Sequence, residues 1–272
     1  MGNELVRSHF GLLAEQGVWA SLYTEPGAKV TAETWSFLIR ARRVIELLQS
    51  SGRELREVLD IGCGTAPIAR SVVAMGSHYE GIDFSPQMVE AAKRNTQDLV
   101  ARGDVRLGVG DATKLDYPDS SFDAVTAMGL VEYFSRDQIN RTLREIKRIL
   151  RPGGVAVLTI PKRWCWGRVV LGLLYPLRMV ARKLPYRKNI KLKQQEEFRR
   201  LYLNPGELDR ACGNVGLRKV SVRHYNVLLL SSPATLLAPR FCYLVNRPFE
   251  GLARIPGGDF LATGYIGLYQ RE

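Results

Sequence analysis

Three aspartates whose carboxylates could bind a ligand stand near the ends of short hydrophobic segments. Asp60 stands just before a glycine-rich turn, Asp83 follows 23 residues later, and Asp111 comes after a third segment. A carboxylate in the position of Asp83 accepts hydrogen bonds from both hydroxyls of a ribose, and Asp111 with Ala112 suits the edge of an adenine. Asp60 would repel a pyrophosphate but can accept from a cationic amino group, through an ordered water or a backbone relay. Together these residues predict a ligand with an adenine, a ribose and a positively charged tail, without a phosphate.

The turn after Asp60, with the sequence Gly62-Cys63-Gly64, offers backbone groups to the same ligand. Glycine has no β-carbon, so N–H groups at Gly62 and Gly64 are open to close approach. The helix that follows directs its positive N-terminal end to the same place. Such a turn alone occurs in many nucleotide-binding α/β proteins, so the aspartates carry the more specific part of the prediction.

A parallel sheet would bring these segments together, because ligands of open α/β sheets bind where the carboxyl ends of the strands meet. Short hydrophobic strands alternate here with helices, which predicts right-handed crossovers and a sheet covered on both faces. The predicted fold class is therefore α/β, with a doubly wound, mostly parallel sheet. The predicted core strands are residues 57–61, 78–83, 105–109, 122–127 and 155–160, and the core helices are 67–75, 85–101 and 136–150.

Four regions are expected along the chain. Residues 1–50 form an N-terminal helical lid, and residues 51–160 form the α/β core. Residues 161–203 are a basic and aromatic insertion that caps the core or faces a membrane, and residues 204–272 complete the sheet around a second helical insertion. The elements predicted outside the core are helices at 4–25, 32–49 and 204–212 and strands at 217–225 and 264–268.

Five segments in this order closely resemble the motif series of the class I S-adenosylmethionine-dependent methyltransferases of the small-molecule type. They are residues 58–66, 81–85, 110–112, 122–123 and 150–154. The resemblance implies a Rossmann-like fold, S-adenosyl-L-methionine as the cofactor and methyl transfer as the activity.

The resemblance also implies which residues hold the cofactor. The glycine turn and Asp60 would line its methionine part, and the segments after the second and third strands would hold its ribose and adenine. Ala66 departs from the glycine usual at that point, but a small residue is kept, so we expect binding to survive. Tyr23 lies in an aromatic stretch that many small-molecule members fold over the cofactor, where an aromatic face favours a cation. The cofactor-binding residues expected are Tyr23, Asp60, Gly62, Cys63, Gly64, Asp83, Phe84, Met88, Asp111, Ala112 and Met128.

Residues 128–134 follow the fourth strand and face the place where the methyl group leaves. Methyl transfer from a sulfonium depends mainly on orientation and desolvation, and a general base is needed only where the acceptor must lose a proton early. Glu132 and Tyr133 are the best-placed catalytic candidates, as base, cation stabiliser or substrate anchor. A capping acid and a packing aromatic would explain them equally well. His9 in the expected lid is the third candidate.

The positive charge of the chain is concentrated in one segment. The net charge is +12, and residues 162–200 contain twelve basic residues against two acidic ones. A segment with this charge and several aromatics suits an amphiphile with an anionic head group, or an anionic membrane surface. Arg168 and Arg178 argue against a transmembrane span within the apolar stretch at 164–181.

The predicted function is methyl transfer to a hydrophobic small molecule, such as a lipid, isoprenoid or polyketide-like metabolite. An RNA or protein methyltransferase that uses the basic segment stays open, as does a non-catalytic cofactor-binding module. Nucleic acid is not the expected partner, because the adenine-N6 signature is absent after the fourth strand and no cysteine follows a proline. The four cysteines show no disulfide or zinc-ligand pattern, so we expect no metal and a cytoplasmic protein, peripheral to a membrane if the insertion docks there. The N-terminus does not resemble a secretory signal, and oligomeric state stays open.

Overall fold

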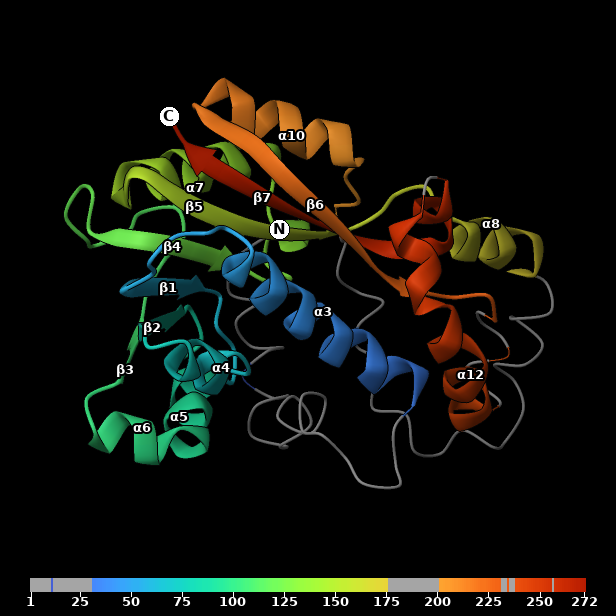
Figure 1. The fold of residues 1–272 in the computed structure, drawn as a ribbon, viewed down its shortest axis with the longest axis horizontal. Helices are drawn as coiled ribbons and strands as arrows, with labels where there is room; N and C mark the ends of the chain where they lie inside the picture. Colours follow the sequence, from blue (N-terminus) through green and yellow to red (C-terminus); the bar gives the residue numbers. More distant parts are fainter. Residues whose placement is uncertain (1–10, 12–30, 176–200, 231–233, 235–237, 256) are drawn as a thin grey trace.

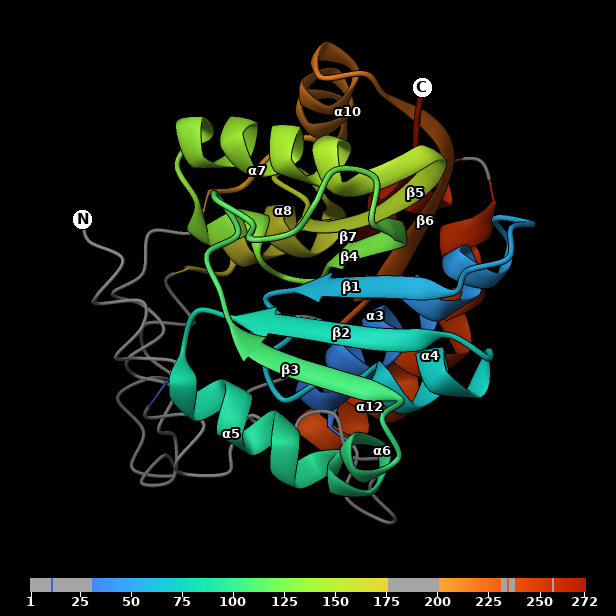
Figure 2. The same cartoon turned by 90° about the vertical axis from the view of Figure 1, so that its left-hand side faces the viewer.

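The computed structural model shows helices on both faces of one central sheet (Figures 1 and 2). It describes residues 11, 31–175, 201–230, 234, 238–255 and 257–272.

Seven strands form the sheet. They are β1 (Glu57–Ile61), β2 (His78–Asp83), β3 (Val105–Val109), β4 (Phe122–Ala127), β5 (Leu150–Pro161), β6 (Leu217–Val227) and β7 (Ala262–Arg271). Their order in the sheet is β3-β2-β1-β4-β5-β7-β6. The first five strands in this order run parallel to one another, and β7 runs antiparallel to its neighbours β5 and β6. The predicted doubly wound, mostly parallel α/β fold is confirmed. The order of the strands reverses between β1 and β4, which is where open α/β sheets bind ligands.

Helices bury the two faces of the sheet. On one face, α7 and α10 pack Leu143, Ile146 and Leu208 against the strands, and Figure 2 shows both helices above the sheet. On the other face, α3 and α4 contribute Leu47 and Val72. The helices are α3 (Ala32–Gln49), α4 (Ala69–Ala74), α5 (Pro86–Asn95), α6 (Gln97–Ala101), α7 (Arg136–Ile149), α8 (Trp166–Leu173), α10 (Pro205–Asn214) and α12 (Pro239–Asn246), with 3-10 helices η1 (Val131–Tyr133), η4 (Arg247–Arg254) and η5 (Gly258–Leu261).

Two predicted core helices differ from the structure. The helix predicted over 85–101 is divided into α5 and α6 at Thr96, whose hydroxyl donates to the carbonyl of Ala92 at 2.8 Å. Threonine side chains compete with the backbone in this way and disturb helix continuation. The helix predicted over 67–75 begins only at Ala69, because Ala66 takes a left-handed φ of 56° and Pro67 remains in the turn.

The outer elements are longer than predicted. β5 begins at Leu150 rather than at residue 155, and α10 continues to Asn214. β6 and β7 also extend beyond the predicted 217–225 and 264–268, because they pair with each other along most of their length.

The N-terminal region expected as a lid contains a structural layer of the fold. α3 buries Val44, Leu47 and Leu48 completely and packs against β5, β6 and β7. Its start is fixed by Thr31, whose side chain accepts from the backbone N–H of Thr34. The helix predicted at 4–25 lies outside the described residues.

Within the described part of the chain, no helix combines the length and the apolar character needed to cross a membrane.

Truncation of Ile146 tests the packing of α7 on the sheet. Ile146 is fully buried, so Ile146→Ala should lower the free energy of unfolding by about 2 to 5 kcal/mol through lost burial and a residual cavity. Guanidinium denaturation followed by circular dichroism measures this. Arg141→Ala on the exposed side of the same helix is the control and should change it by less than about 0.5 kcal/mol. Equal effects of the two substitutions would contradict this packing.

Candidate functional site

An open cavity lies where β1, β2 and β4 end. Figure 2 shows β1, β2 and β3 pointing to one edge of the sheet. The space between its lining residues, including open solvent at the mouth, is about 980 Å³. Its wall is mostly apolar, and Asp83 and Asp111 are the charged residues among the described ones that line it. The wall consists of Ile61, Gly62, Cys63, Gly64, Pro67, Asp83, Phe84, Met88, Gly110, Asp111, Ala112, Met128, Gly129, Leu130, Tyr133, Phe134 and Gln138.

The glycine turn forms one side of the cavity. Gly62 and Gly64 both have left-handed φ values, 70° and 55°, which glycine adopts without steric cost. The N–H groups of Gly62 and Cys63 donate to the carbonyl of Ile82 at 2.8 and 3.0 Å, so the turn is fixed to β2. A β-carbon on Gly62 would lie 3.0 Å from the side chain of Leu130. The turn therefore lines the cavity with backbone, but the two N–H groups predicted to be open are used inside the fold. The N–H of Gly62 donates to Ile82, and that of Gly64 donates to the carboxylate of Asp83.

Asp83 is held at the end of β2 by two backbone groups. Its Oδ2 accepts from the N–H of Gly64 at 3.0 Å, and its Oδ1 accepts from the N–H of Ser85 at 2.9 Å. Burial raises the pKa of Asp83, while these backbone hydrogen bonds act to lower it. Each carboxylate oxygen can accept a further hydrogen bond, so the oriented Asp83 can still bind two hydroxyls of a ligand.

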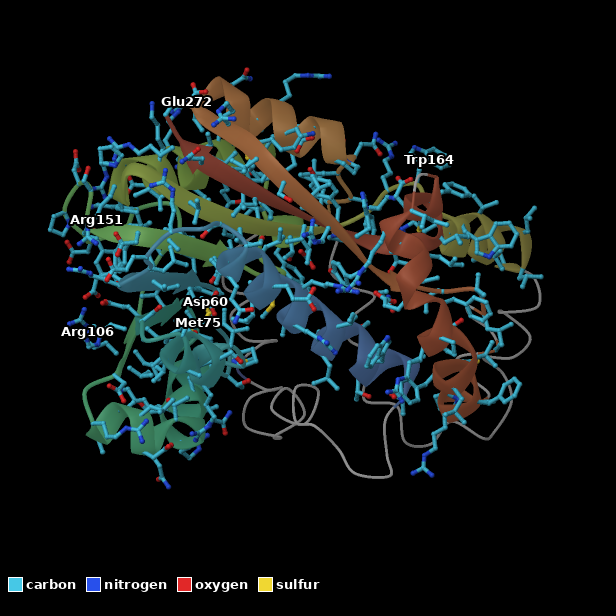
Figure 3. The ribbon with its side chains drawn as sticks, viewed as in Figure 1. Asp60, Met75, Arg106, Arg151, Trp164 and Glu272 are labelled. Carbon is cyan, nitrogen blue, oxygen red and sulfur yellow. The ribbon has the colours of Figure 1, made fainter. Side chains whose placement is uncertain are left out.

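Asp60 does not line the cavity, and this corrects the predicted placement. Its side chain is fully buried (Figure 3), and the hydroxyls of Tyr79 and Thr126 donate to its two oxygens at 2.8 and 2.6 Å. Burial raises the pKa of Asp60 to about 6. Both side-chain oxygens are therefore used inside the fold, and Asp60 reaches a ligand only through the turn that it supports.

The predicted adenine side of the site comes together in the structure. Phe84, Met88, Asp111 and Ala112 all line the cavity, and Met128, a further predicted cofactor residue directly after β4, lines it as well. Asp111 is exposed, and its Oδ1 accepts from both the N–H and the hydroxyl of Thr113 at 2.8 Å. The side chain is thus held at the rim of the cavity.

The predicted catalytic residues do not stay together. Tyr133 lines the cavity, whereas Glu132 is buried outside its wall and its carbonyl accepts from the N–H of Leu201 at 2.7 Å. The expectation that both face the reaction centre therefore applies to Tyr133 alone. His9 and Tyr23 lie outside the described residues.

Several wall residues were not predicted as site residues, including Gln138 in the first turn of α7. The side chain of Gln138 accepts from the N–H of Ser135 at 2.9 Å, and Ser135 accepts from the N–H of Gln138. This reciprocal capping box has the sequence signature Ser-x-x-Gln, which the chain displays. The position of this capping box directly after residues 128–134 was the feature of the sequence that could have indicated Gln138 as a wall residue. Pro67, Leu130 and Phe134 likewise line the cavity beside predicted residues.

Comparisons with known proteins agree with this geometry. Residues 58–154 match a family model described as a methyltransferase domain. The demethylmenaquinone methyltransferase of Staphylococcus saprophyticus is 37% identical over 132 residues, which are 46% of this chain and 50% of that protein. The ubiquinone biosynthesis O-methyltransferase of Azoarcus is 27% identical over 170 residues, 61% of this chain and 66% of that protein. The chain spans about half the length of the first two demethylmenaquinone methyltransferases that it matches.

Solved structures show the same fold. The crystal structure of the magnesium protoporphyrin IX methyltransferase of Synechocystis with bound SAH has a TM-score of 0.67 and 14% identity, and the match covers 100% of both chains. At this identity the likeness concerns the fold.

The raised pKa of the buried Asp60 predicts how the free energy of unfolding depends on pH. Its folded pKa of about 6 is above its ordinary value of 3.8, so it contributes stability below pH 4 that is lost as the pH rises through 6. The loss is about 3 kcal/mol in the free energy of unfolding. In Asp60→Asn this loss is absent, so the variant should gain stability relative to the wild type between pH 4 and pH 7, as measured by denaturation at each pH.

Asp98→Asn is the control for this experiment. Arg70 lowers the pKa of Asp98 from 3.8 to about 2, so Asp98 titrates below pH 5 in both the folded and the unfolded chain. The difference between Asp98→Asn and the wild type should stay constant from pH 5 to pH 7, where that for Asp60→Asn still changes. A constant difference for Asp60→Asn as well would contradict the raised pKa.

Proposed function

We propose that this chain, whose α/β core is a methyltransferase domain of the class I S-adenosylmethionine-dependent family, transfers a methyl group to a hydrophobic small molecule. The observation that carries the proposal is the oriented carboxylate of Asp83 in a mostly apolar cavity at the carboxyl edge of the sheet. The match of residues 58–154 to the methyltransferase domain supports it.

The residues of the cavity fit S-adenosyl-L-methionine. Asp83 would accept from the ribose hydroxyls, and the backbone of Gly62 and Gly64 in the cavity wall would contact the methionine part. Phe84 and Met88 would pack on the adenine, with Asp111 and Ala112 at its edge. When bound, this cofactor supplies an electrophilic methyl group on a sulfonium. The cavity lacks a concentration of basic side chains among its described residues, which suits a ligand without phosphates.

The acceptor proposed is a quinone-like molecule with an apolar body. Leu130, Tyr133 and Phe134 also line the cavity, after the end of β4, and an aromatic ring system would bury its faces against them. The names of the demethylmenaquinone and ubiquinone relatives support this class. Lipid, isoprenoid and polyketide-like acceptors, with or without an anionic head group, share the same requirement.

The contribution of the protein to the reaction would be orientation and exclusion of water. Tyr133 is the described residue best placed to contact the acceptor, and its hydroxyl can orient an acceptor oxygen. Glu132 is buried in the same 3-10 helix, next to Tyr133, and we propose it as a positioning residue. A base contributed by His9 remains part of the proposal. Such a protein would work in the cytoplasm on an acceptor supplied by a membrane.

Cofactor affinity tests the first half of the proposal. Asp83→Ala removes an ionised acceptor for two hydroxyls, so calorimetry should show S-adenosylmethionine binding weakened about 100-fold. Asp83→Asn, which keeps the shape, should give a smaller loss. Asp104→Ala, in the turn before β3 and paired with Arg102, is the matched control with unchanged affinity. Unchanged affinity in Asp83→Ala, or no binding by the wild type, would overturn the cofactor assignment.

The acceptor class is tested by incubation with methyl-labelled cofactor and a cell extract, separated into lipid, aqueous, RNA and protein fractions. The label should enter the lipid fraction, and demethylated quinols should then serve as purified acceptors. Tyr133→Ala should reduce kcat/KM for the acceptor at least about tenfold with little change in cofactor affinity, because only acceptor contacts are lost. Label in RNA or protein would instead support the corresponding alternative activity. Absence of transfer to any fraction would support a binding module.

A further inference from the structure

Large apolar side chains stand exposed on α8 and its flanks. Trp166, Val169 and Leu173 follow one another at helical spacing, and all three are exposed, Leu173 to 76%. Trp164 and Tyr175 extend this stripe at its two ends. Figure 3 places Trp164 toward the end of the molecule opposite to Arg106 and Arg151. Exposed apolar groups in such a row are typical of interaction surfaces rather than of ordinary solvated helices.

A second group of exposed apolar residues lies on α12 and the 3-10 helices that follow. Phe241 and Leu244 are exposed on α12 at 60% and 64%, and Phe249, Ile255 and Phe260 continue the group. η4 contacts both α12 and η5, and η5 contacts α8. Figure 1 shows α8 and α12 at the same end of the long axis. These two groups together are called the α8–α12 surface below.

The charge of the α8–α12 surface is positive. Arg163, Arg240, Arg247 and Arg254 are exposed on it. Of the acidic residues in its described segments, Glu250 is buried and accepts from the N–H groups of Asn226 and Val227. Asp259 receives Lys162, whose Nζ is 2.6 Å from its carbonyl and 3.5 Å from its carboxylate. The surface therefore shows arginines around apolar side chains, while Glu250 is buried and the half-exposed Asp259 lies beside Lys162.

We propose that the α8–α12 surface docks on a lipid bilayer that contains anionic lipids. Tryptophan and tyrosine favour the boundary between head groups and hydrocarbon, and arginines near an anionic surface add attraction. The aliphatic members Val169, Leu173, Leu244 and Ile255 decide between a bilayer and a nucleic acid. They gain by burial in hydrocarbon and offer nothing to a phosphate or to a base edge.

This docking rests on the proposed function and adds to it the place from which the acceptor is taken. α8 begins five residues after the carboxyl end of β5, at the sheet edge where the cavity opens beside β4. A lipid-soluble acceptor could then pass from the bilayer to the cavity without crossing water. The surface thereby assigns the membrane as the source of the acceptor.

Vesicle flotation with the full chain tests the proposal. The wild type should bind vesicles of phosphatidylcholine with 30% phosphatidylglycerol, a composition chosen for the assay as roughly that of an anionic membrane surface, and should bind pure phosphatidylcholine at least about tenfold less. The combined variant Leu173→Glu, Phe241→Glu, Leu244→Glu should lose at least about 90% of the bound fraction, because charges replace the inserted groups. Arg163→Glu with Arg240→Glu should weaken binding about tenfold or more. Val220→Glu is the matched control, because Val220 is exposed on β6 outside this surface, and its binding should equal that of the wild type.

Thermal unfolding and S-adenosylmethionine affinity of each variant separate a docking defect from a folding defect. Unchanged values with lost flotation support the proposal, also if the transfer assays fail. Wild-type-like flotation of the triple glutamate variant would overturn it. A wild type that ignores vesicles but forms a dimer, which the same variant dissociates, would overturn it in favour of a second copy, and displacement by RNA with no vesicle preference would do so in favour of a nucleic acid.

Discussion

The buried carboxylate of Asp60 joins the three central strands beneath the cavity. It belongs to β1 and accepts from Tyr79 of β2 and Thr126 of β4. Removing a carboxylate from water is unfavourable, and two hydrogen bonds together with the positive charge of Arg40 offset part of that penalty. Because these hydrogen bonds connect β1 to β2 and β4, they fix the ends of the three strands relative to one another, and these ends carry the glycine turn, Asp83 and Met128. The cavity depends on this alignment, since its walls come from separate βα loops.

The parallel core could be predicted because its signals are local. Strand segments are short and hydrophobic, and Ser85 and Ser135 mark helix starts by capping the next turn. Other boundaries depend on contacts that no local pattern reveals. Thr96 divides a helix by bonding to the carbonyl of Ala92, and β5 extends back to Leu150 through pairing with Phe122. The packing of α3 on the sheet likewise depends on tertiary contacts, although the spacing of its apolar residues predicted a helix.

The site shows the same division between local and long-range information. The turn glycines and the wall residues that follow β2 and β3 were identified from their places at strand ends. The direction of the Asp60 side chain could not be identified in this way. A strand that is buried on both faces has no alternation of polar and apolar residues to show which side chains point into the core. Tyr79 and Thr126 lie 19 and 66 residues away from Asp60, so their pairing required the fold. Gln138 was not identified as a site residue, because its role in the capping box of α7 already explains its presence at that position.

The chain segment at 201–203 connects the insertion to the cavity wall. Leu201 donates to the carbonyl of Glu132, and Arg163 donates to the carbonyl of Leu203 at 3.3 Å. The return of the insertion is therefore stitched to the turn that carries Tyr133 and to the residues that follow β5. Because Leu201 is hydrogen-bonded to Glu132, a displacement of residues 201–203 would shift the backbone next to Tyr133. One wall of the cavity is in this way coupled to a segment almost 70 residues further along the chain.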